Sequence, residues 1–485
     1  MENEKKKLWN PFSKEAEEGN VPNRELLSYS AALMGQNLTY GIVNGWLFYF
    51  CTDILHISPD KVGYLTGFSR IWDGINDPIV GTLIDRRKTK PGQKLHPYLG
   101  KLPIIVGLLT ALLFIDFGVS ETVSLCIILA IYLAWDFTYS FQDVALWGMM
   151  ALISPHAKER ERVSQWLNIG VGAAGIFTGL IPMVIGAKEA LGVSEKTLFV
   201  FFGIFFGFIG ELISSLAYKT KERVAYIPKE NQQSLLKDIA ELRHNKILLL
   251  LLLSQLLDFI GGAISQIYFF KYCVTVEVAG KVINGETVQT VFGFLVGALG
   301  SVSMFFAVKL ANKIGGMRKT VILAQTMNTV VRIIAFFIGF DTIPQMLACA
   351  ALLAVAAIPS NMIGIAQRAI LCDAIEYAEW KTGKRTEGIS NSMQNLTNKV
   401  KDALKLITSG LVLTALHYDA RLGIDGQSEA FYKAQWPIFI LLPALGSILY
   451  LIPFLCIRYS NETKAQVESD LKARRAAAEA ETETA

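Results

Sequence analysis

Arg70, Asp73 and Asp77 lie inside an apolar stretch that is long enough to cross a membrane. Their spacing of three and four residues places all three side chains on one face of a helix. An ionised carboxylate in hydrocarbon is costly, so two on one face indicate a site that binds a compensating cation or proton. The alternative is a structural Arg–Asp pair that joins two helices, which would need only one of the acids.

A second polar face is predicted over residues 123–153. Asp136, Ser140, Asp143 and Trp147 follow at spacings of four, three and four residues, so they share one side of a helix. An indole beside a carboxylate suits a sugar, because the ring stacks on its apolar face while the acid accepts hydrogen bonds from its hydroxyl groups. The alternative is an interfacial tryptophan with acids that face a water-filled vestibule.

A third polar face is predicted over residues 388–416, where Asn395, Lys399 and Asp402 lie on one side of the helix. A lysine inside a membrane needs a counter-ion, which the acids of the other two stretches can supply. In the alternative interpretation, Lys399 extends to the cytoplasmic surface.

Oxygen donors surround the two acids of the first face. Carboxylate, amide and hydroxyl oxygens are the ligands that a hard cation prefers, which makes Na⁺ a candidate at Asp73 and Asp77. Two close carboxylates also repel each other, so a proton can compete for the same site. The spacing leaves Na⁺, H⁺ and Li⁺ open.

The composition is that of a membrane protein. Of 485 residues, 52% are hydrophobic and 18% are charged, against about 25% charged in soluble domains. A net charge of +4 gives no indication of a nucleic-acid partner. The six cysteines lie in or beside apolar segments without a CxxC pair, which is typical of reduced thiols and not of a disulfide framework or a zinc site.

Twelve apolar segments can span a bilayer. They cover about residues 27–52, 60–84, 99–120, 123–153, 164–187, 196–218, 245–273, 286–311, 317–340, 343–371, 388–416 and 432–457. Lysine and arginine gather in alternate connections, such as residues 86–94 and 158–162, whereas residues 53–60 contain neither. The positive-inside rule therefore places both termini in the cytoplasm.

The longest polar interruption, residues 219–244, is predicted to be a cytoplasmic middle loop between two six-helix bundles. The bundles would cover residues 27–218 and 245–459, with cytoplasmic tails over residues 1–26 and 460–485. The second tail is expected to be a frayed helix or disordered. This organisation predicts an all-α membrane protein and a two-half secondary transporter, with its site near the midplane.

Four stretches of sequence resemble the glycoside–pentoside–hexuronide:cation symporters, the melibiose-permease-like family of the major facilitator superfamily. They are RIWDGINDPIVGTLID, DRRKTKPGQKLHPYL, YSFQDVALW and DAIEYAEWKTGKRTEGISNSMQNLTNKVKDAL, and the similarity extends over most of residues 25–460. The resemblance implies the twelve-helix major facilitator fold, and symport of a sugar or glycoside with a cation.

The resemblance also implies roles for residues. The expected cation ligands are Asp73, Asn76, Asp77 and Ser140, with serine where a threonine is usual. The expected substrate residues are Asn37, Asp136, Asp143, Trp147, Gln394, Asn395 and Lys399. The resemblance gives no role to Asp136, which is grouped with the substrate residues by its helical face. Coupling or gating roles are expected at Arg70, Asp85, Arg86, Asp373 and Arg385.

The sequence departs from this family at the sugar site. Asn37 stands where a sugar-binding aspartate is usual, and the arginine that partners it is missing around residues 167–170. His96 replaces an arginine, and Gly364 falls near a usual tryptophan. These changes disfavour melibiose itself. They favour a neutral pentoside or glucoside, or a uronate held near Lys399.

We expect a monomer in a bacterial-type inner membrane, with no cofactor besides its coupling cation and no nucleic-acid partner. A lysolipid-like amphiphile is an alternative substrate on the same scaffold, but the polar face over residues 123–153 disfavours it. A membrane-embedded enzyme is a further alternative. Against it, all five histidines map to loops or span ends, and neither HExxH nor GxSxG occurs. A channel would need charges in a repeated ring.

Overall fold

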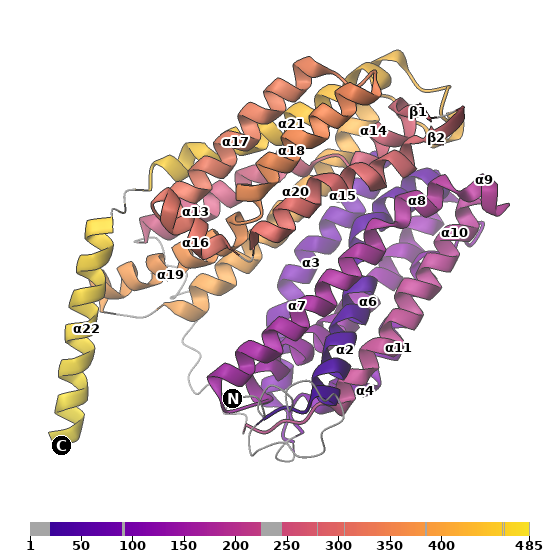
Figure 1. The fold of residues 1–485 in the computed structure, drawn as a ribbon. Helices are drawn as coiled ribbons and strands as arrows, with labels where there is room; N and C mark the ends of the chain where they lie inside the picture. Colours follow the sequence, from indigo (N-terminus) through magenta and orange to yellow (C-terminus); the bar gives the residue numbers. More distant parts are fainter. Residues whose placement is uncertain are drawn as a thin grey trace, which may run out of the picture. The chain divides into compact units, whose positions relative to one another are not determined.

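The computed structural model describes residues 20–89, 93–224, 245–278, 280–304, 306–383, 386–457, 459 and 461–484. Nearly all of these residues are helical, as Figure 1 shows. Most of the predicted middle loop lies outside the described residues, as does Arg385.

The chain divides into two compact units. One comprises Met1–Lys229 and Leu413–Gln427, and the other comprises Glu230–Val412 and Ser428–Ala485. The predicted second bundle includes residues 413–427, whereas the structure groups them with the first unit. One reason is that the Tyr418 hydroxyl donates a 2.8 Å hydrogen bond to Asp53 Oδ1, at the end of the first span.

The first unit is built from helices that follow the first six apolar segments. They are α2 (Asn23–Tyr49), η1 (Phe50–Ile54), α3 (Pro59–Arg86), α4 (His96–Gly100), α5 (Leu102–Leu113), α6 (Glu121–Leu152), α7 (Ala157–Gly179), α8 (Ile181–Gly186), α9 (Lys188–Leu191), α10 (Glu195–Phe202), η2 (Gly203–Ile209), α11 (Gly210–Ser214) and η3 (Ser215–Lys219), with η5 (Ala420–Leu422) from the later segment. Ser194 caps α10 by accepting a hydrogen bond from the backbone N–H of Thr197.

The second unit follows the remaining apolar segments. Its elements are α13 (Lys246–Leu257), η4 (Asp258–Gly262), α14 (Gln266–Cys273), the antiparallel strands β1 (Thr275–Val278) and β2 (Lys281–Asn284), α15 (Gly285–Met304), α16 (Ala307–Ile314), α17 (Met317–Ile338), α18 (Ile343–Ser360), α19 (Ile363–Thr382), most of α20 (Glu387–Ala415), α21 (Glu429–Leu455) and α22 (Asn461–Thr484). Thr342 and Gln345 form a capping box at the start of α18.

Eight helical segments in the described part of the chain are long and apolar enough to cross a membrane. The other four predicted spans coincide with α2, α3, α15 and α20, which are also long helices. The predicted tenth span over residues 343–371 is interrupted, since α18 ends at Ser360 and α19 begins at Ile363. The all-α membrane fold is therefore confirmed, and a total of twelve spans is consistent with it.

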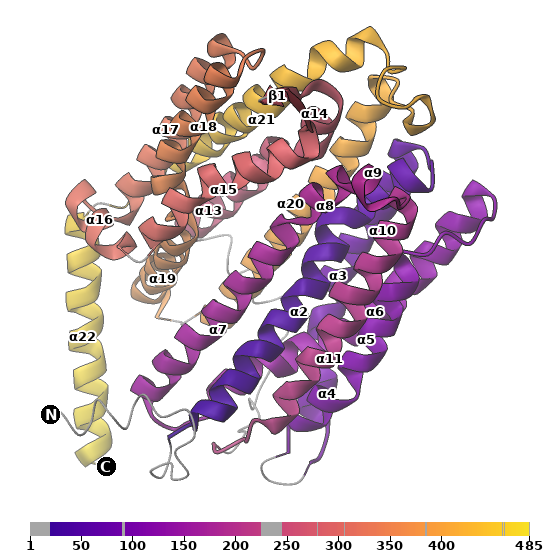
Figure 2. The ribbon, with the colours of Figure 1, turned by 45° about the vertical axis from the view of Figure 1, so that its right-hand side comes forward.

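Glycines let the helices of the first unit approach closely. A Cβ added at Gly35 in α2 would lie 2.1 Å from the carbonyl oxygen of Gly210, and one added at Gly170 in α7 would lie 2.2 Å from that of Ser30. Small residues allow such contacts between membrane helices, where backbone packing replaces the hydrophobic drive. As a result, α2 lies against both α7 and α11 (Figure 2).

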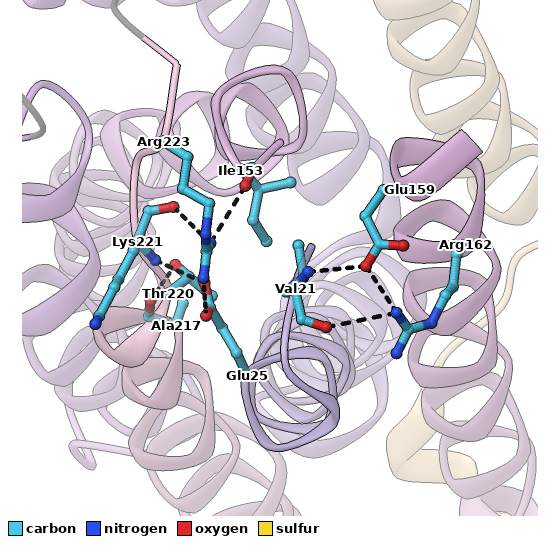
Figure 3. Close-up of polar contacts among 9 residues, drawn as sticks. All are labelled: Val21, Glu25, Ile153, Glu159, Arg162, Ala217, Thr220, Lys221 and Arg223. Carbon is cyan, nitrogen blue, oxygen red and sulfur yellow. Dashed lines mark hydrogen bonds and ion pairs between the residues drawn. The ribbon is translucent and has the colours of Figure 1, made fainter. Parts of the chain in front are cut away.

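A polar network joins the start of α2 to the segments beside it (Figure 3). The Arg223 guanidinium donates two hydrogen bonds to the Glu25 carboxylate, at 2.8 and 2.6 Å. Glu159 in α7 accepts hydrogen bonds from the backbone N–H of Val21 at 2.9 Å and from Arg162 at 2.7 Å. These contacts fix the first residues of α2 between α7 and the segment that follows η3.

Of the two expectations for the C-terminal tail, a frayed helix or disorder, the structure has a helix. Residues Asn461–Thr484 form α22, in which Val467 and Leu471 are buried. Lys464 donates a 2.7 Å hydrogen bond to Asp373 in α19, and the Trp380 indole donates one of 2.8 Å to Asp470. The alanine-rich composition favours a helix, and the two buried aliphatic side chains give it a face to pack.

Candidate functional site

The polar faces of α3 and α6 meet in a hydrogen-bonded cluster inside the first unit. Asn76 Nδ2 donates to Asp136 Oδ2 at 3.2 Å and to Ser140 Oγ at 3.0 Å. Ser140 Oγ in turn donates to Asp77 Oδ1 at 3.0 Å. Asn76, Asp136 and Ser140 are at most 2% exposed. The structure thus brings three of the four expected cation ligands into one chain of contacts, which we call the α3–α6 cluster (Asn76, Asp77, Asp136 and Ser140).

The fourth expected ligand, Asp73, lies one turn before Asp77 on α3 and is also buried. Arg70 Nη1 is 3.8 Å from Asp73 Oδ2, and its side chain is equally enclosed. Arg70 therefore contributes one positive charge beside the three carboxylates of Asp73, Asp77 and Asp136. An Arg–Asp pair is therefore present, but both residues lie on α3, so it does not join two helices as in the alternative interpretation.

The donor set of the α3–α6 cluster suits a small hard cation. In the part of the chain that the structure describes, no three His, Cys, Asp or Glu side chains gather closely enough to hold a metal ion by themselves. A cation between these helices would therefore also need the Ser140 hydroxyl and the Asn76 amide oxygen as ligands. Asn76 turns its nitrogen toward the acceptors of α6, which leaves the amide oxygen for such a role.

Asp136, which was expected among the substrate residues, lies in this cluster. It accepts a hydrogen bond from Asn76, one of the expected cation ligands on the facing helix. Asp136 and Asp143 share a helical face, but seven residues separate them, which is about 10 Å along a helix axis. One face can therefore serve two separate groups, and Asp136 supplies a third acid to the first of them.

Two of the expected substrate residues, Asn37 and Asp143, belong to a second network between α2 and α6, which we call the substrate network. Gln36 Nε2 donates to Asp143 Oδ1 and to the Tyr139 hydroxyl, both at 2.6 Å. Asn37 Nδ2 donates to Gln36 Oε1 at 3.0 Å and to the Leu33 carbonyl at 2.8 Å. Gln36 is buried and was missed by the sequence analysis, although an amide next to Asn37 in an apolar span is itself a signal.

Aromatic rings line the same helices. Tyr139 stacks on Trp135 with ring centroids 4.8 Å apart, and on Tyr40 at 6.0 Å. Trp147 lies one turn beyond Asp143, and 44% of its surface is exposed. An exposed indole one turn from a carboxylate is the arrangement that stacking on a sugar ring requires.

Three expected substrate residues lie on α20, within the second unit. Lys399 and Gln394 are half-buried, and Asn395 is exposed. Gln394 Oε1 is buried and has no hydrogen-bond partner among the described residues. That oxygen can therefore still accept a hydrogen bond.

The expected coupling residues have different surroundings. Arg86 is exposed at the end of α3, and the backbone carbonyl of Asp85 accepts a 2.9 Å hydrogen bond from Lys94 Nζ. Lys94 also donates to the Arg87 carbonyl at 2.7 Å, and it is 8% exposed. The sequence analysis missed this lysine, which places its charge at the negative C-terminal end of α3. Asp373 pairs with Lys464 of α22.

Residues 28–461 match the model of the family described as MFS/sugar transport protein. The symporter YjmB of Bacillus subtilis, which is itself uncharacterised, is 26% identical over 460 residues, covering 92% of this chain and 95% of the relative. Lactose permease of Lactobacillus delbrueckii subsp. bulgaricus is 27% identical over 410 residues, or 80% of this chain and 63% of the permease, so the match spans less than two thirds of that relative. The isoprimeverose transporter of Lactiplantibacillus pentosus is 23% identical, with 90% of this chain and 88% of the relative covered.

Solved structures share the fold. A POT family transporter in complex with 5-aminolevulinic acid has a TM-score of 0.60 at 11% identity, covering 90% of this chain and 97% of its own. A bacterial homologue of the lysosomal transporter Spinster has a TM-score of 0.59 at 13% identity, covering 91% and 100%. At such identities the likeness concerns the fold alone. The family match confirms the resemblance to the sugar–cation symporters: the chain belongs to the MFS/sugar transport protein family, and it is a multi-pass membrane transporter and not an enzyme.

Proposed function

We propose that the protein transports a sugar or glycoside together with Na⁺ or H⁺, by alternating access. The observation that carries this proposal is the buried α3–α6 cluster, in which Asn76 and Ser140 hold the carboxylates of Asp77 and Asp136. Two relatives are named for lactose and for isoprimeverose, which supports a sugar-like substrate for this chain.

The cation site would comprise Asp73, Asn76, Asp77 and Ser140, with Asp136 as an additional acid. Three carboxylates beside one arginine carry an excess of negative charge in a low-dielectric environment. A bound cation reduces that excess. Neutralisation would then favour closure of the transporter around its substrate, and coupling follows if closure is favourable only with both ligands bound or with neither.

In the first unit, the substrate site would include Asp143 and Trp147 on α6 and Asn37 and Gln36 on α2. Asp143 already accepts a hydrogen bond from Gln36, so a sugar hydroxyl would add to an oriented carboxylate. Asn37 Nδ2 donates two hydrogen bonds within α2, which leaves the amide oxygen to accept one. A neutral sugar fits this mixture of donors and acceptors.

We further propose that the protein is a monomer of a bacterial inner membrane, with both termini in the cytoplasm. The alternation of lysine- and arginine-rich connections supports this orientation. A reporter that is active only in the cytoplasm, fused after Ala485, should give a signal. A signal from a periplasmic reporter at the same position would reverse the topology.

Counterflow in proteoliposomes tests the function directly. Vesicles loaded with unlabelled pentosides, hexosides or hexuronides would be assayed for uptake of the labelled compound, with Na⁺ or choline as the external cation and at several pH values. We expect uptake of at least one sugar that depends on Na⁺ or on pH. Asp73→Asn and Asp77→Asn should abolish cation-driven accumulation while substrate binding remains. Uphill accumulation by both variants would remove these acids from the cation site.

A further inference from the structure

Glu211 is a second buried acid of the first unit, outside both of the groups described above. It lies in α11, and none of its surface is exposed. The helix α11 packs closely on α2 and α5 at glycines. Gly210 of α11 contacts Gly35 of α2. On the α5 side, a Cβ added at Gly107 would lie 3.0 Å from Glu211 Cβ. The carboxyl group is therefore shielded from bulk solvent.

The partner of Glu211 is an amide on α6. Gln142 Nε2 donates to Glu211 Oε2 at 2.6 Å and to Ser214 Oγ at 2.8 Å, so both of its hydrogens are used. Glu211 Oε1 and Gln142 Oε1 are both buried and have no hydrogen-bond partner among the described residues. Two groups that already share one hydrogen bond thus each retain one unused acceptor.

The elements packed around Glu211 bring no compensating positive charge. On α6, its titratable neighbours are Asp143 and Tyr139, of which the first is an acid. The helix α5 contains no titratable side chain, and η2 contains none either.

The basic residues at the ends of these helices are remote from the carboxyl group. Arg24 on α2 is eleven residues before Gly35, which is about 16 Å along a helix, and Lys219 at the end of η3 is exposed. The remaining polar neighbours, Thr39 and Ser214, are neutral hydroxyl groups. An ionised Glu211 would therefore be a buried charge without a positively charged partner among the described residues, which is strongly disfavoured.

We propose that Glu211 is a proton-binding site, and that its protonated carboxyl forms a cyclic acid–amide pair with Gln142. A proton taken up from water resides on Oε1, and the resulting O–H donates to Gln142 Oε1 while Oε2 continues to accept from Nε2. One proton satisfies both unused oxygens. The proton stays bound through the transport cycle, unlike the cation of the proposed symport.

The acid–amide pair makes Glu211 a positioning residue for α6. Gln142 lies between Ser140 of the α3–α6 cluster and Asp143 of the substrate network, so the pair fixes the stretch of α6 that carries both. Removal of the proton at alkaline pH would place two acceptors and a charge in this contact. The transport rate should therefore fall at alkaline pH in the wild-type protein.

Infrared spectroscopy of the full-length protein in liposomes tests the proton directly. The difference spectrum between the wild type and Glu211→Gln should contain the carbonyl band of a protonated carboxyl group at neutral pH. Glu189→Gln, at an exposed position of α9, is the matched control and should show only loss of an ionised carboxylate. A Glu211→Gln spectrum that also loses only an ionised carboxylate would overturn the proposal. This measurement needs neither sugar nor coupling cation, so it is independent of the proposed symport.

Counterflow at varied pH tests the positioning role. Glutamine can make both hydrogen bonds of the acid–amide pair, so Glu211→Gln should retain the neutral-pH rate within about twofold and lose the alkaline fall. The exchanged pair Gln142→Glu with Glu211→Gln should restore that fall, because it contains one acid again. Loss of counterflow in folded Glu211→Gln, with the exchanged pair equally inactive, would show that an ionised or exchanging Glu211 is required and would refute a resident proton.

Discussion

Ser140→Ala removes the one hydroxyl that joins the two sides of the α3–α6 cluster. In the wild type this hydroxyl donates to Asp77 at 3.0 Å and accepts from Asn76 at 3.0 Å. A hydrogen bond to a charged group contributes about 1.5–3 kcal/mol, and in this one the Ser140 hydroxyl is buried while Asp77 is half-buried. If the hydroxyl is also a cation ligand, the same loss appears in cation binding. At 1.4 kcal/mol for each factor of ten, cation affinity should fall about 10- to 150-fold.

Ser140→Thr is the matched control, because threonine retains the hydroxyl and adds only a methyl group. The family resemblance implies a threonine at this position, so the variant should keep the wild-type cation affinity. The assay measures substrate counterflow as a function of Na⁺ concentration and of pH, and it compares the concentrations that give half-maximal rate. Thermal unfolding in detergent identifies any general loss of stability in the alanine variant.

Two outcomes would refute the reasoning for Ser140. A half-maximal cation concentration that is unchanged in Ser140→Ala would show that the hydroxyl neither binds the cation nor orients Asp77 for it. Equal losses in Ser140→Ala and Ser140→Thr would show that the position tolerates only the volume of serine, since the hydroxyl is present in one variant and missing in the other. The first result would place the cation elsewhere, and the second would show that loss of the hydroxyl is not the cause of the weaker binding.

Four further predictions concern other contacts. Asp136→Asn keeps an acceptor for Asn76 but removes one of three negative charges, so the half-maximal cation concentration should rise by about tenfold. Trp147→Ala should weaken substrate binding by about 1–3 kcal/mol, measured as equilibrium affinity. An unchanged affinity would favour the alternative interpretation, in which Trp147 is an interfacial tryptophan. In Asn37→Asp, the new carboxylate cannot donate a hydrogen bond to Gln36, and it adds a negative charge near Asp143. Uptake of a glucuronide should therefore fall more than uptake of a neutral glucoside. Equal effects on both substrates would argue against a place for Asn37 in the sugar site. Arg223→Ala should lower the free energy of unfolding by about 1–2 kcal/mol, because it removes two partly screened hydrogen bonds to Glu25. Those bonds raise the pKa of Arg223, so their contribution to the free energy of unfolding is complete at all working pH values and is lost only above the usual pKa range of an arginine. A melting temperature of Arg223→Ala equal to that of the exposed Lys88→Ala control would contradict this prediction.

The helices of this fold are readable from the sequence because apolar runs of span length have few other uses. The boundaries of α3 and α6 follow the predicted segments closely, since each helix is limited by polar turns. Two details were not readable. The interruption between α18 and α19 follows a proline in an otherwise apolar run, and the docking of α22 depends on two buried aliphatic residues in a polar helix. Hydropathy alone gives no weight to either feature.

The site was predictable to the level of helical faces and no further. Spacing placed Asp73 and Asp77 on one face of α3, and Ser140 and Asp143 on one face of α6. Which turn of α3 meets which turn of α6 depends on side-chain packing between helices, so the contact of Asp136 with Asn76 could not be read from either helix alone. Gln36, Lys94 and Glu211 were missed for a related reason. Each is a single polar residue without a periodic pattern, and its meaning comes from its partner.

The proposed coupling between cation and substrate has a short route within the first unit. Ser140 belongs to the α3–α6 cluster, and Asp143 belongs to the substrate network, yet both lie on α6 about 4.5 Å apart along its axis. A cation that shifts Ser140 would therefore move Asp143 with it, because one rigid turn carries both. Linkage requires the effect to be reciprocal, so bound substrate must raise cation affinity by the same factor by which the cation raises substrate affinity. It follows that Ser140→Ala should reduce both the effect of the cation on substrate affinity and the effect of the substrate on cation affinity. Loss of only one of these effects would contradict coupling through α6.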